Sequence, residues 1–293
     1  MMESSKLECV LRKKAVLGEG PFWESGKERL IWVDIEGKSL HFYNPAASED
    51  KVYPMEKLIG TAVPAADGSY LLALQDGIYR FREEDGTMKH IASPERHIPG
   101  NRFNDGKCDP TGRFWLGTLN MEGKSGMASL YRMDADLKIT RVETGIGLSN
   151  GMGWSPAGDQ MYFIDTTAGT VYAYDYRLDT GEISGRRVLL RFSGESGMPD
   201  GMTVDADGRL WIAHWGGSRV TCWDPVSFKE QERIELPARL VTSCAFGGDN
   251  LEDLYITTAD DQESGQEDPY GGSLFRIKTG AKGMPAASFG SQI

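Results

Sequence analysis

Short apolar runs that carry an aromatic residue recur six times along the chain, each directly after a turn-forming stretch. Each run has the length of a strand and is rich in the aromatic and β-branched residues that favour strands. The runs cover residues 30–35, 70–75, 114–119, 161–166, 210–215 and 254–259. No window keeps the 3.6-residue apolar period of a helix. The pattern therefore predicts a chain built from strands.

The spacing of these runs is nearly regular. Between equivalent aromatic positions the separations are 38, 45, 47, 49 and 44 residues, measured at Trp32, Tyr70, Trp115, Tyr162, Trp211 and Tyr255. Periods of about 40 to 50 residues are typical of propeller blades and of solenoid repeats. The sequence thus repeats one supersecondary unit six times.

Each aromatic run is followed by a second strand candidate, and five of the six units add a third. The second candidates are residues 39–43, 77–82, 128–133, 170–176, 219–223 and 272–277. The third candidates are residues 51–55, 88–92, 139–142, 187–192 and 232–236. Because the segment before each run supplies an innermost strand, these five units have the four strands of a propeller blade.

The sixth unit lacks its outer strand, since the chain after Lys278 is a tail rich in Gly, Ala and Ser. Residues 7–11 are otherwise unassigned and can supply that strand. We therefore predict an all-β fold, a six-bladed β-propeller with four antiparallel strands per blade, closed by the N-terminal strand joining the last blade. One domain would cover residues 1–293. A β-sandwich or an open array of hairpins is the alternative.

Composition and charge limit the partners. The chain has 36 Gly in 293 residues, which suits many tight turns, and a net charge of −11 with no basic cluster to attract nucleic acid or an anionic membrane. Its apolar runs fall short of the ~20 residues that span a bilayer, and its start lacks a signal-peptide core. The four cysteines show no paired spacing, which argues against a disulfide framework and a thiolate zinc site. We expect a soluble, cytoplasmic protein.

The start of the innermost strand carries one equivalent position in each unit, four residues before an apolar position of that strand. The residues at this position are Glu19, Gly60, Asn104, Asn150, Asp200 and Thr242. In a ring of blades, equivalent positions at the start of the inner strands converge at one mouth of the central channel. The two carboxylates and two amides of this set are therefore expected to face one another.

Two interpretations of this set remain open. Asn-Gly and Asp-Gly pairs are common turn dipeptides, and each polar member is followed closely by Gly. Two carboxylates and two amides at one focus also form an all-oxygen ligand set that suits Ca²⁺, Mg²⁺ or Mn²⁺. A cation would offset the repulsion between Glu19 and Asp200 in a partly desolvated channel.

Ordered motifs at blade spacing give the chain a resemblance to a known family. The motifs are GEGPFW (18–23), RFNDGKCDPTGRFWLGT (102–118), LSNGMGWSP (148–156), PDGMTVDADGRLWIA (199–213) and GGSLFRI (271–277). Over nearly its whole length the sequence resembles the regucalcin (senescence marker protein) and gluconolactonase family of six-bladed propellers.

The resemblance implies one bound divalent metal ion, with Ca²⁺, Zn²⁺, Mg²⁺ and Mn²⁺ as candidates. The residues implied as its ligands are Glu19, Asn150 and Asp200. The residues implied in binding the substrate are Arg102, Asn104 and Glu122. Gly60 and Thr242 offer no ligand side chain like those of the other four, so the ion would keep open positions for water or substrate.

An open divalent ion suits hydrolysis of an ester or lactone, because it polarises a carbonyl and lowers the pKa of bound water. The resemblance implies that the substrate is a sugar lactone, similar to gluconolactone, opened to the aldonic acid. Asp200 would accept a proton from the attacking water as well as bind the metal. No G-x-S-x-G nucleophile elbow is present. The expected partner is the small lactone alone, bound by a monomer or weak homo-oligomer.

Two other functions remain open. One is a metal-dependent esterase or organophosphate hydrolase of the same fold, and the other is a non-catalytic calcium-binding protein. Arg102 argues against the second, because a pure ion-binding site has no use for a cation beside its metal.

Further candidate residues have two interpretations each. Asp105 either takes part in catalysis or braces a turn, and His214 is either a proton shuttle or a hydrogen-bonded strand residue. The acidic stretch of Asp260, Asp261, Glu263, Glu267 and Asp268 lacks EF-hand spacing, so we expect a solvated connection. Trp23, Trp154 and the tryptophans of the strands either pack in the blade cores or form platforms for a sugar, and we expect them in the cores.

Overall fold

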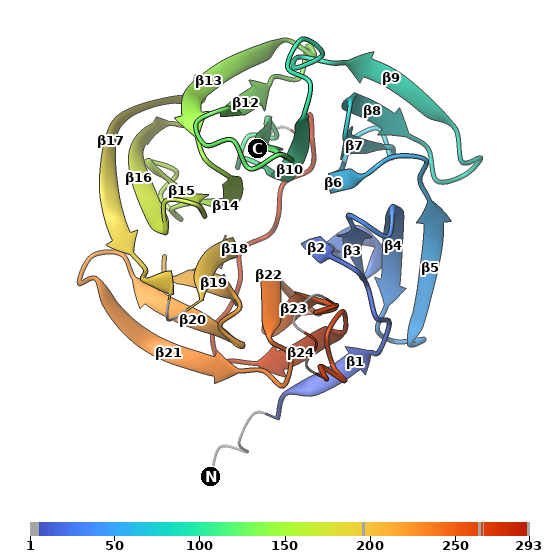
Figure 1. Cartoon of the computed structure of the whole chain (residues 1–293), viewed down its shortest axis with the longest axis vertical. Coiled ribbons are helices and arrows are strands. Elements are labelled where there is room, and N and C mark those ends of the chain that lie inside the picture. The colour runs from blue at the N-terminus through green and yellow to red at the C-terminus, as the bar shows by residue number, and fades with distance from the viewer. Residues whose placement is uncertain (1–5, 195–196, 263–264, 266, 292–293) are drawn as a thin grey trace.

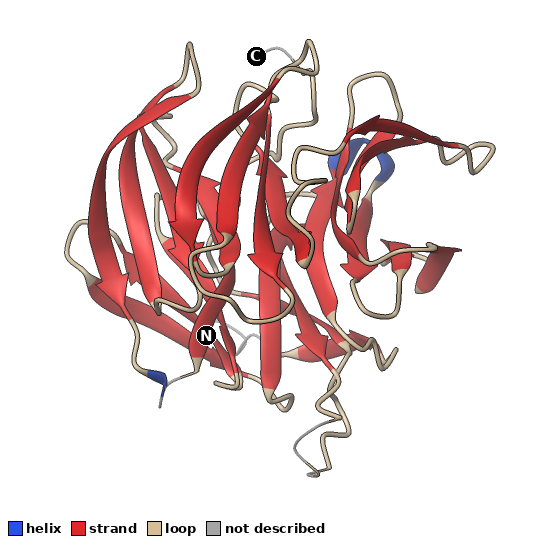
Figure 2. Ribbon diagram, turned by 45° about the horizontal axis from the view of Figure 1, so that its top comes forward, coloured by secondary structure: helices blue, strands red, loops and turns tan. Residues whose placement is uncertain are grey.

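Six four-stranded antiparallel sheets surround a central channel in the computed structural model of the chain (Figure 1). The structure describes residues 6–194, 197–262, 265 and 267–291. Strands make up almost all of the regular structure, as Figure 2 shows. The prediction of an all-β six-bladed propeller is confirmed.

Each blade runs from an inner strand at the channel to an outer strand at the rim. Blade 1 consists of β2 (Gly18–Glu24), β3 (Arg29–Asp34), β4 (Ser39–Asn44) and β5 (Glu49–Pro54), with the short 3-10 helix η1 (Ser25–Lys27) between β2 and β3. Blade 2 consists of β6 (Ile59–Pro64), β7 (Tyr70–Leu74), β8 (Gly77–Phe81) and β9 (Met88–Ala92). Blade 3 consists of β10 (Asn101–Cys108), β11 (Phe114–Asn120), β12 (Ala128–Met133) and β13 (Ile139–Ile146).

The other three blades follow the same order. Blade 4 consists of β14 (Ser149–Trp154), β15 (Gln160–Asp165), β16 (Thr170–Arg177) and β17 (Glu182–Arg191). Blade 5 consists of β18 (Met198–Val204), β19 (Leu210–Trp215), β20 (Arg219–Asp224) and β21 (Lys229–Glu235). Blade 6 consists of β22 (Leu240–Gly247), β23 (Asp253–Ala259), β24 (Leu274–Lys278) and, as its outer strand, β1 (Glu8–Leu11).

The N-terminal strand closes the ring as predicted. β1 pairs antiparallel with β24, and Glu8 lies opposite Arg276. The Arg276 guanidinium also donates a hydrogen bond to the Glu8 carboxylate at 2.7 Å. Tyr43 of blade 1 donates to the carbonyl of Val10 at 3.2 Å, which ties β1 to the neighbouring blade. Pairing the two ends of the chain in one sheet leaves no open edge between the last blade and the first.

The hydrophobic core consists of clusters between adjacent blades, because each sheet must bury both faces. Between blades 3 and 4, for example, the rings of Trp115, Trp154 and Tyr176 meet edge-to-face with centroids 6.0 to 6.2 Å apart. Trp32, Trp115 and Trp211 are fully buried in this way. The alternation of large side chains on both faces explains why the aromatic runs dominate the sequence pattern.

Two copies of a D-x-x-G-R-x-W motif fix the turns between inner and second strands in blades 3 and 5. The fully buried Asp205 accepts hydrogen bonds from the backbone N–H groups of Asp207 and Arg209, at 3.0 and 2.9 Å. It also accepts from Arg209 Nε at 2.8 Å and from Trp211 Nε1 at 2.9 Å. Asp109 plays the same part in blade 3. These acidic residues are therefore structural.

The C-terminal tail has a defined path that the sequence did not suggest. Figure 1 shows it crossing the middle of the ring from blade 6 toward blade 3. Gly283 forms a bridge with Asp205, and Phe289 forms one with Ala65 of blade 2. Phe289 is buried in the cluster between blades 2 and 3. The tail thus stabilises the ring from one side of the channel.

Among the described residues, no helix has the length and apolar character needed to cross a membrane.

Deleting residues 1–12 should leave the edge of β24 unpaired, because β1 is the strand that pairs with that edge in the described part of the chain. An open edge recruits other chains, so we expect aggregation and loss of folded protein. Light scattering and thermal melting would measure both effects. A deletion of residues 1–6, which keeps β1, is the matched control. Equal stability and solubility of the two truncated proteins would contradict the closing role of β1.

Asp205→Ala should lower the free energy of unfolding by about 3 kcal/mol or more, because it leaves several buried donors without an acceptor. Chemical denaturation would measure the loss. Asp207→Ala in the same turn is the control, since its side chain is 76% exposed and we expect a change within about 0.5 kcal/mol. Similar effects of the two substitutions would show that the buried network does not hold the turn.

Candidate metal and substrate site

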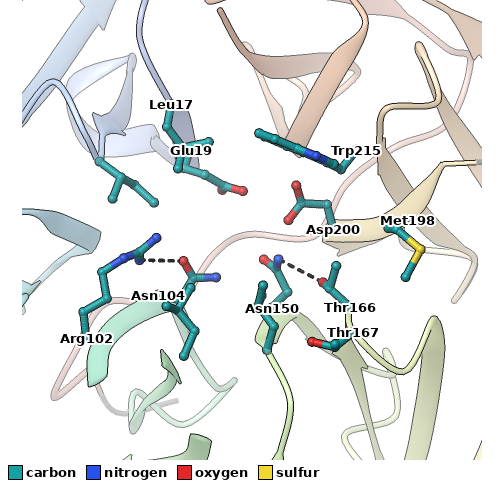
Figure 3. A pocket seen from close by; sticks show the side chains of 13 residues that line it. Leu17, Glu19, Arg102, Asn104, Asn150, Thr166, Thr167, Met198, Asp200 and Trp215 are labelled. Carbon is teal, nitrogen blue, oxygen red and sulfur yellow. Dashed lines mark hydrogen bonds between the residues drawn. The ribbon is translucent and has the colours of Figure 1, made fainter. Parts of the chain in front are cut away.

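One cavity of about 400 Å³ opens at a mouth of the central channel. The residues that line it are Leu17, Glu19, Ile35, Arg102, Asn104, Leu119, Leu148, Asn150, Thr166, Thr167, Met198, Asp200 and Trp215. Five of the six site residues expected from the sequence are in this set. Figure 3 shows Glu19, Asn150 and Asp200 pointing toward one another, with Arg102 and Asn104 beside them.

An irregularity in every inner strand lies at the same level as this cavity. The strand register shifts between Glu19/Phe22, Ile59/Thr61, Phe103/Gly106, Ser149/Met152, Pro199/Met202 and Val241/Ser243. Bulges of this kind re-aim side chains, and in four of the six blades they direct Glu19, Asn104, Asn150 and Asp200 into the cavity.

The glycines that follow these residues serve close packing. A Cβ atom on Gly151 would lie 2.6 Å from the backbone nitrogen of Met202, and one on Gly201 would lie 2.0 Å from the Ser243 hydroxyl. Both contacts are with the inner strand of the next blade. The Asn-Gly and Asp-Gly pairs lie inside β14 and β18, so interpreting them as hairpin turns is wrong.

Asn150 is held in one orientation. Its Nδ2 donates to the Thr166 hydroxyl at 3.1 Å, and that hydroxyl in turn donates to the Pro199 carbonyl at 2.8 Å. These two hydrogen bonds therefore fix the amide nitrogen of Asn150 on the Thr166 side. Among the described residues, the buried Oδ1 of Asn150 has no hydrogen-bond donor. A buried acceptor without a partner is costly, so this oxygen calls for a cation, water or ligand.

Three buried carboxyl groups act on one another at the channel mouth. Burial, then the charge of Asp200, then that of Asp105, raise the pKa of Glu19 well above its ordinary value. Burial and the charge of Asp105 raise the pKa of Asp200 in the same direction. The repulsion predicted between Glu19 and Asp200 is therefore present, and it would be relieved by a cation or a proton.

The donor set fits a hard divalent cation. In the described part of the chain, no group of three or more His, Cys, Asp or Glu side chains is arranged to hold a metal ion. The set here consists instead of the two carboxylates of Glu19 and Asp200 and the amide oxygen of Asn150. Oxygen ligands of this kind suit Ca²⁺, Mg²⁺ or Mn²⁺, with water or substrate in the remaining positions.

Asn104 differs from Asn150 in that both its amide oxygen and its amide nitrogen have a hydrogen-bond partner. Its Oδ1 accepts from Arg102 Nη1 at 2.8 Å, and its Nδ2 donates to the Ser149 carbonyl at 2.9 Å. Arg102 Nη1 also donates to the carbonyl of Phe103. These bonds hold the Arg102 guanidinium at the wall of the cavity, where burial lowers its pKa to about 10. At neutral pH the group remains charged.

Glu122 is not brought to this cavity. It lies in the exposed turn after β11, and its carboxylate forms an ion pair with Lys124 at 2.5 Å. Its side chain is 59% exposed and does not line the site. The backbone of such a turn does not continue the geometry of the strand, so sequence spacing does not predict where its side chains point.

Asp105 faces the channel, close enough to raise the pKa of both Glu19 and Asp200. It also accepts a hydrogen bond from the Gly106 backbone at 2.7 Å, so it braces the bulge as well. His214 lies inside blade 5, where it contacts the Thr221 hydroxyl at 2.7 Å. Burial lowers the pKa of His214 to about 4, so its ring is neutral at neutral pH. His214 does not line the cavity.

The acidic stretch before β24 is more ordered than expected. Asp261 is buried and forms an ion pair with Arg239, whose backbone N–H donates to Asp268 at 2.8 Å. The prediction that this acidic stretch is a solvated connection is therefore wrong for Asp261 and Asp268. Glu263, named with them, lies outside the described residues.

Several residues near the channel mouth were not identified from the sequence. Lys107 crosses the channel to donate to the Met202 carbonyl at 2.8 Å, and burial lowers its pKa against the opposing charge of Asp105. Thr166 and Trp215 were missed because they lie at the ends of the second strands, where the apolar pattern stops. The last position of each aromatic run was the available signal for Thr166 and Trp215.

Comparison with known proteins identifies the family. Residues 17–260 match the SMP-30/gluconolactonase/LRE-like region. The chain belongs to this family. It is 37% identical to "Putative sugar lactone lactonase YvrE" of Bacillus subtilis, over 96% of this chain and 97% of that protein. It is 38% identical to regucalcin of Danio rerio, over 98% and 99% of the two chains.

A solved structure supports the same relationship. The crystal structure described as a calcium-binding protein, regucalcin, from Agrobacterium tumefaciens superposes with a TM-score of 0.90 at 28% identity. The match covers 96% of each chain. Family membership and fold are thus shown over nearly the whole chain.

Thr166→Val should weaken divalent metal binding by about 10-fold or more, because it removes the hydroxyl that orients the Asn150 amide. Calorimetric titration with Ca²⁺, Mg²⁺ and Mn²⁺ would measure the change. Thr167→Val is the matched control, since Thr167 lines the same cavity without a hydrogen bond to Asn150. Unchanged metal affinity in Thr166→Val would show that Asn150 is not a ligand.

Proposed function

We propose that the protein is a metal-dependent lactonase that opens sugar lactones to aldonic acids. The observation that carries the proposal is the placement of Arg102 and Asn104 beside the buried oxygen set of Glu19, Asn150 and Asp200, in one cavity. The set can hold a cation, and the neighbouring pair can bind an oxygen-rich molecule against it.

A bound divalent ion would supply Lewis-acid polarisation of the lactone carbonyl and would acidify a water molecule. Asp200, buried and facing the cavity, accepts the proton that the attacking water loses. Its position at the bulge of β18 directs its carboxylate into the cavity. The bond between the carbonyl carbon and the ring oxygen of the lactone then breaks, and Asp200 returns its proton to that oxygen, which leaves as a hydroxyl group of the aldonic acid.

Arg102 and Asn104 orient the substrate. Among the described residues, Nε and Nη2 of Arg102 have no hydrogen-bond acceptor, although the side chain is buried. These two groups are therefore available to donate to hydroxyl oxygens of a sugar ring. The Asn104 side chain holds the guanidinium in place, so the donors are ordered before the substrate arrives, which lowers the entropic cost of binding.

Arg102 supports this choice over a pure calcium-binding role. The names of the relatives do not decide between the two roles, since one is named "Putative sugar lactone lactonase YvrE" and another structure is described as a calcium-binding protein. A cation buried next to a metal site reduces metal affinity by repulsion, so a protein that only stored calcium would not benefit from Arg102. An enzyme that binds a hydroxylated substrate does benefit.

The direct test is a pH-stat assay of aldonolactone hydrolysis with Ca²⁺, Zn²⁺, Mg²⁺ or Mn²⁺ added to metal-free protein. Paraoxon and phenyl acetate should be run alongside the lactones. We expect metal-dependent hydrolysis of the lactones and little turnover of the other two. Metal binding without hydrolysis of any ester or lactone would overturn the proposal.

Asp200→Asn should lower kcat by about 10²- to 10⁴-fold, even at metal concentrations that saturate the site, because the amide cannot accept the proton. Asn150→Ala removes a neutral ligand only, so excess metal should restore part of its rate. Calorimetry and lactonase rates would be measured on both variants. Asp207→Asn, the same change at an exposed carboxylate, is the control. Full rescue of Asp200→Asn by metal would limit Asp200 to a ligand role.

A further inference from the structure

Trp215 is the one tryptophan of the aromatic strands whose position contradicts the sequence-based expectation. Trp32, Trp115 and Trp211 are buried in blade cores, whereas Trp215 is 37% exposed and lines the cavity. It is the last residue of β19, and its neighbour His214 points into blade 5 instead. Strand alternation therefore places the indole on the opposite face of the sheet from His214, and its position at the end of β19 brings it into the cavity lining.

Within the described residues, the indole ring of Trp215 makes no aromatic contact and its Nε1 makes no hydrogen bond. Exposed large apolar side chains at the edge of a concave site are characteristic of ligand contact. A purely structural role for Trp215 would bury it, as it does the other strand tryptophans.

Met198 extends the same surface. It lies directly opposite Trp215 in the pairing of β18 with β19, so the two side chains are neighbours at the end of blade 5. Both residues line the cavity. Met198 lies two residues before Asp200 on β18. Figure 3 shows both residues on the far side of the cavity from Arg102.

Donors and apolar surface lie at different places on the cavity wall. Arg102 offers hydrogen-bond donors, while Trp215 and Met198, on the far side in Figure 3, offer an aromatic ring and hydrocarbon. The other apolar lining residues are Leu17, Ile35, Leu119 and Leu148, and Leu119 is the cross-strand neighbour of Arg102. A fully hydroxylated sugar would place polar groups against these apolar side chains, which leaves those groups without partners.

We infer that the preferred substrates are lactones that carry a hydrocarbon substituent, and that Trp215 and Met198 select them by packing against that substituent. This inference rests on the proposed lactonase function and names its substrate class. The lactone carbonyl and hydroxyl oxygens face Asp200 and Arg102, while the substituent lies on the indole. Trp215 is then a specificity-determining residue that takes no part in proton transfer.

The test uses a series of γ-lactones with methyl, ethyl and propyl substituents, compared with gluconolactone. For the wild-type protein, kcat/KM should rise by about four-fold per added CH₂ group, the fold-change that corresponds to ~0.8 kcal/mol of burial. In Trp215→Ala this increase should disappear, and Trp215→Phe should keep part of it. Met198→Ala should reduce it. Metal affinity, measured by calorimetry, should be unchanged in all three variants.

Phe228→Ala is the matched control, because it removes an exposed aromatic side chain from the turn between β20 and β21, outside the cavity. It should keep the wild-type dependence on chain length. A flat dependence in the wild-type protein, or the same dependence in Trp215→Ala, would overturn the inference while leaving the lactonase proposal intact.

Binding of the corresponding alkyl lactams, which resist hydrolysis, separates the inference from the reaction. Calorimetry should show affinity rising with chain length in the wild-type protein and not in Trp215→Ala. If no lactone is hydrolysed with any metal, the proposed function fails, and the lactam series still decides whether Trp215 selects hydrocarbon. Affinities that do not depend on chain length would reject the apolar wall as a selective surface.

Discussion

The close approach of the inner strands at the channel mouth is the constraint on which the site depends. A side chain at Gly151 or Gly201 would collide with the inner strand of the next blade. With glycine there, Asn150 and Asp200 on neighbouring blades come near enough to share one focus. The bulges then turn both side chains inward, so the glycines and the bulges together build the ligand set.

The close approach of the inner strands has an electrostatic consequence. Glu19, Asp105 and Asp200 are buried together, and the repulsion among them is only partly balanced by the buried cations Arg102 and Lys107. Removing charges from water is costly unless they are paired. The three carboxylates therefore destabilise the channel mouth when all of them are ionised and no metal is bound. A bound divalent cation would remove that instability, and occupancy of the site would then be coupled to the stability of the inner strands.

The repeat made the fold predictable, and the limits of the prediction follow from the same cause. Inner and second strands bury both faces, so their apolar runs mark them clearly, whereas the outer strands are mostly polar. β17 thus begins at Glu182, five residues before its predicted start, because its exposed residues carry no apolar pattern. The path of residues 279–291 was not predictable either, since its contacts are with distant loops and not with a repeat.

The site was predictable to the extent that it follows the repeat. Glu19, Asn150 and Asp200 occupy equivalent blade positions, so aligning the units was enough to bring them together. Glu122 and Trp215 lie where strands end, and there the repeat gives no orientation. The residues that would hold the metal therefore follow from the architecture that all blades share. The residues that would choose the substrate belong to individual blade ends, where one propeller can differ from another without disturbing the ring.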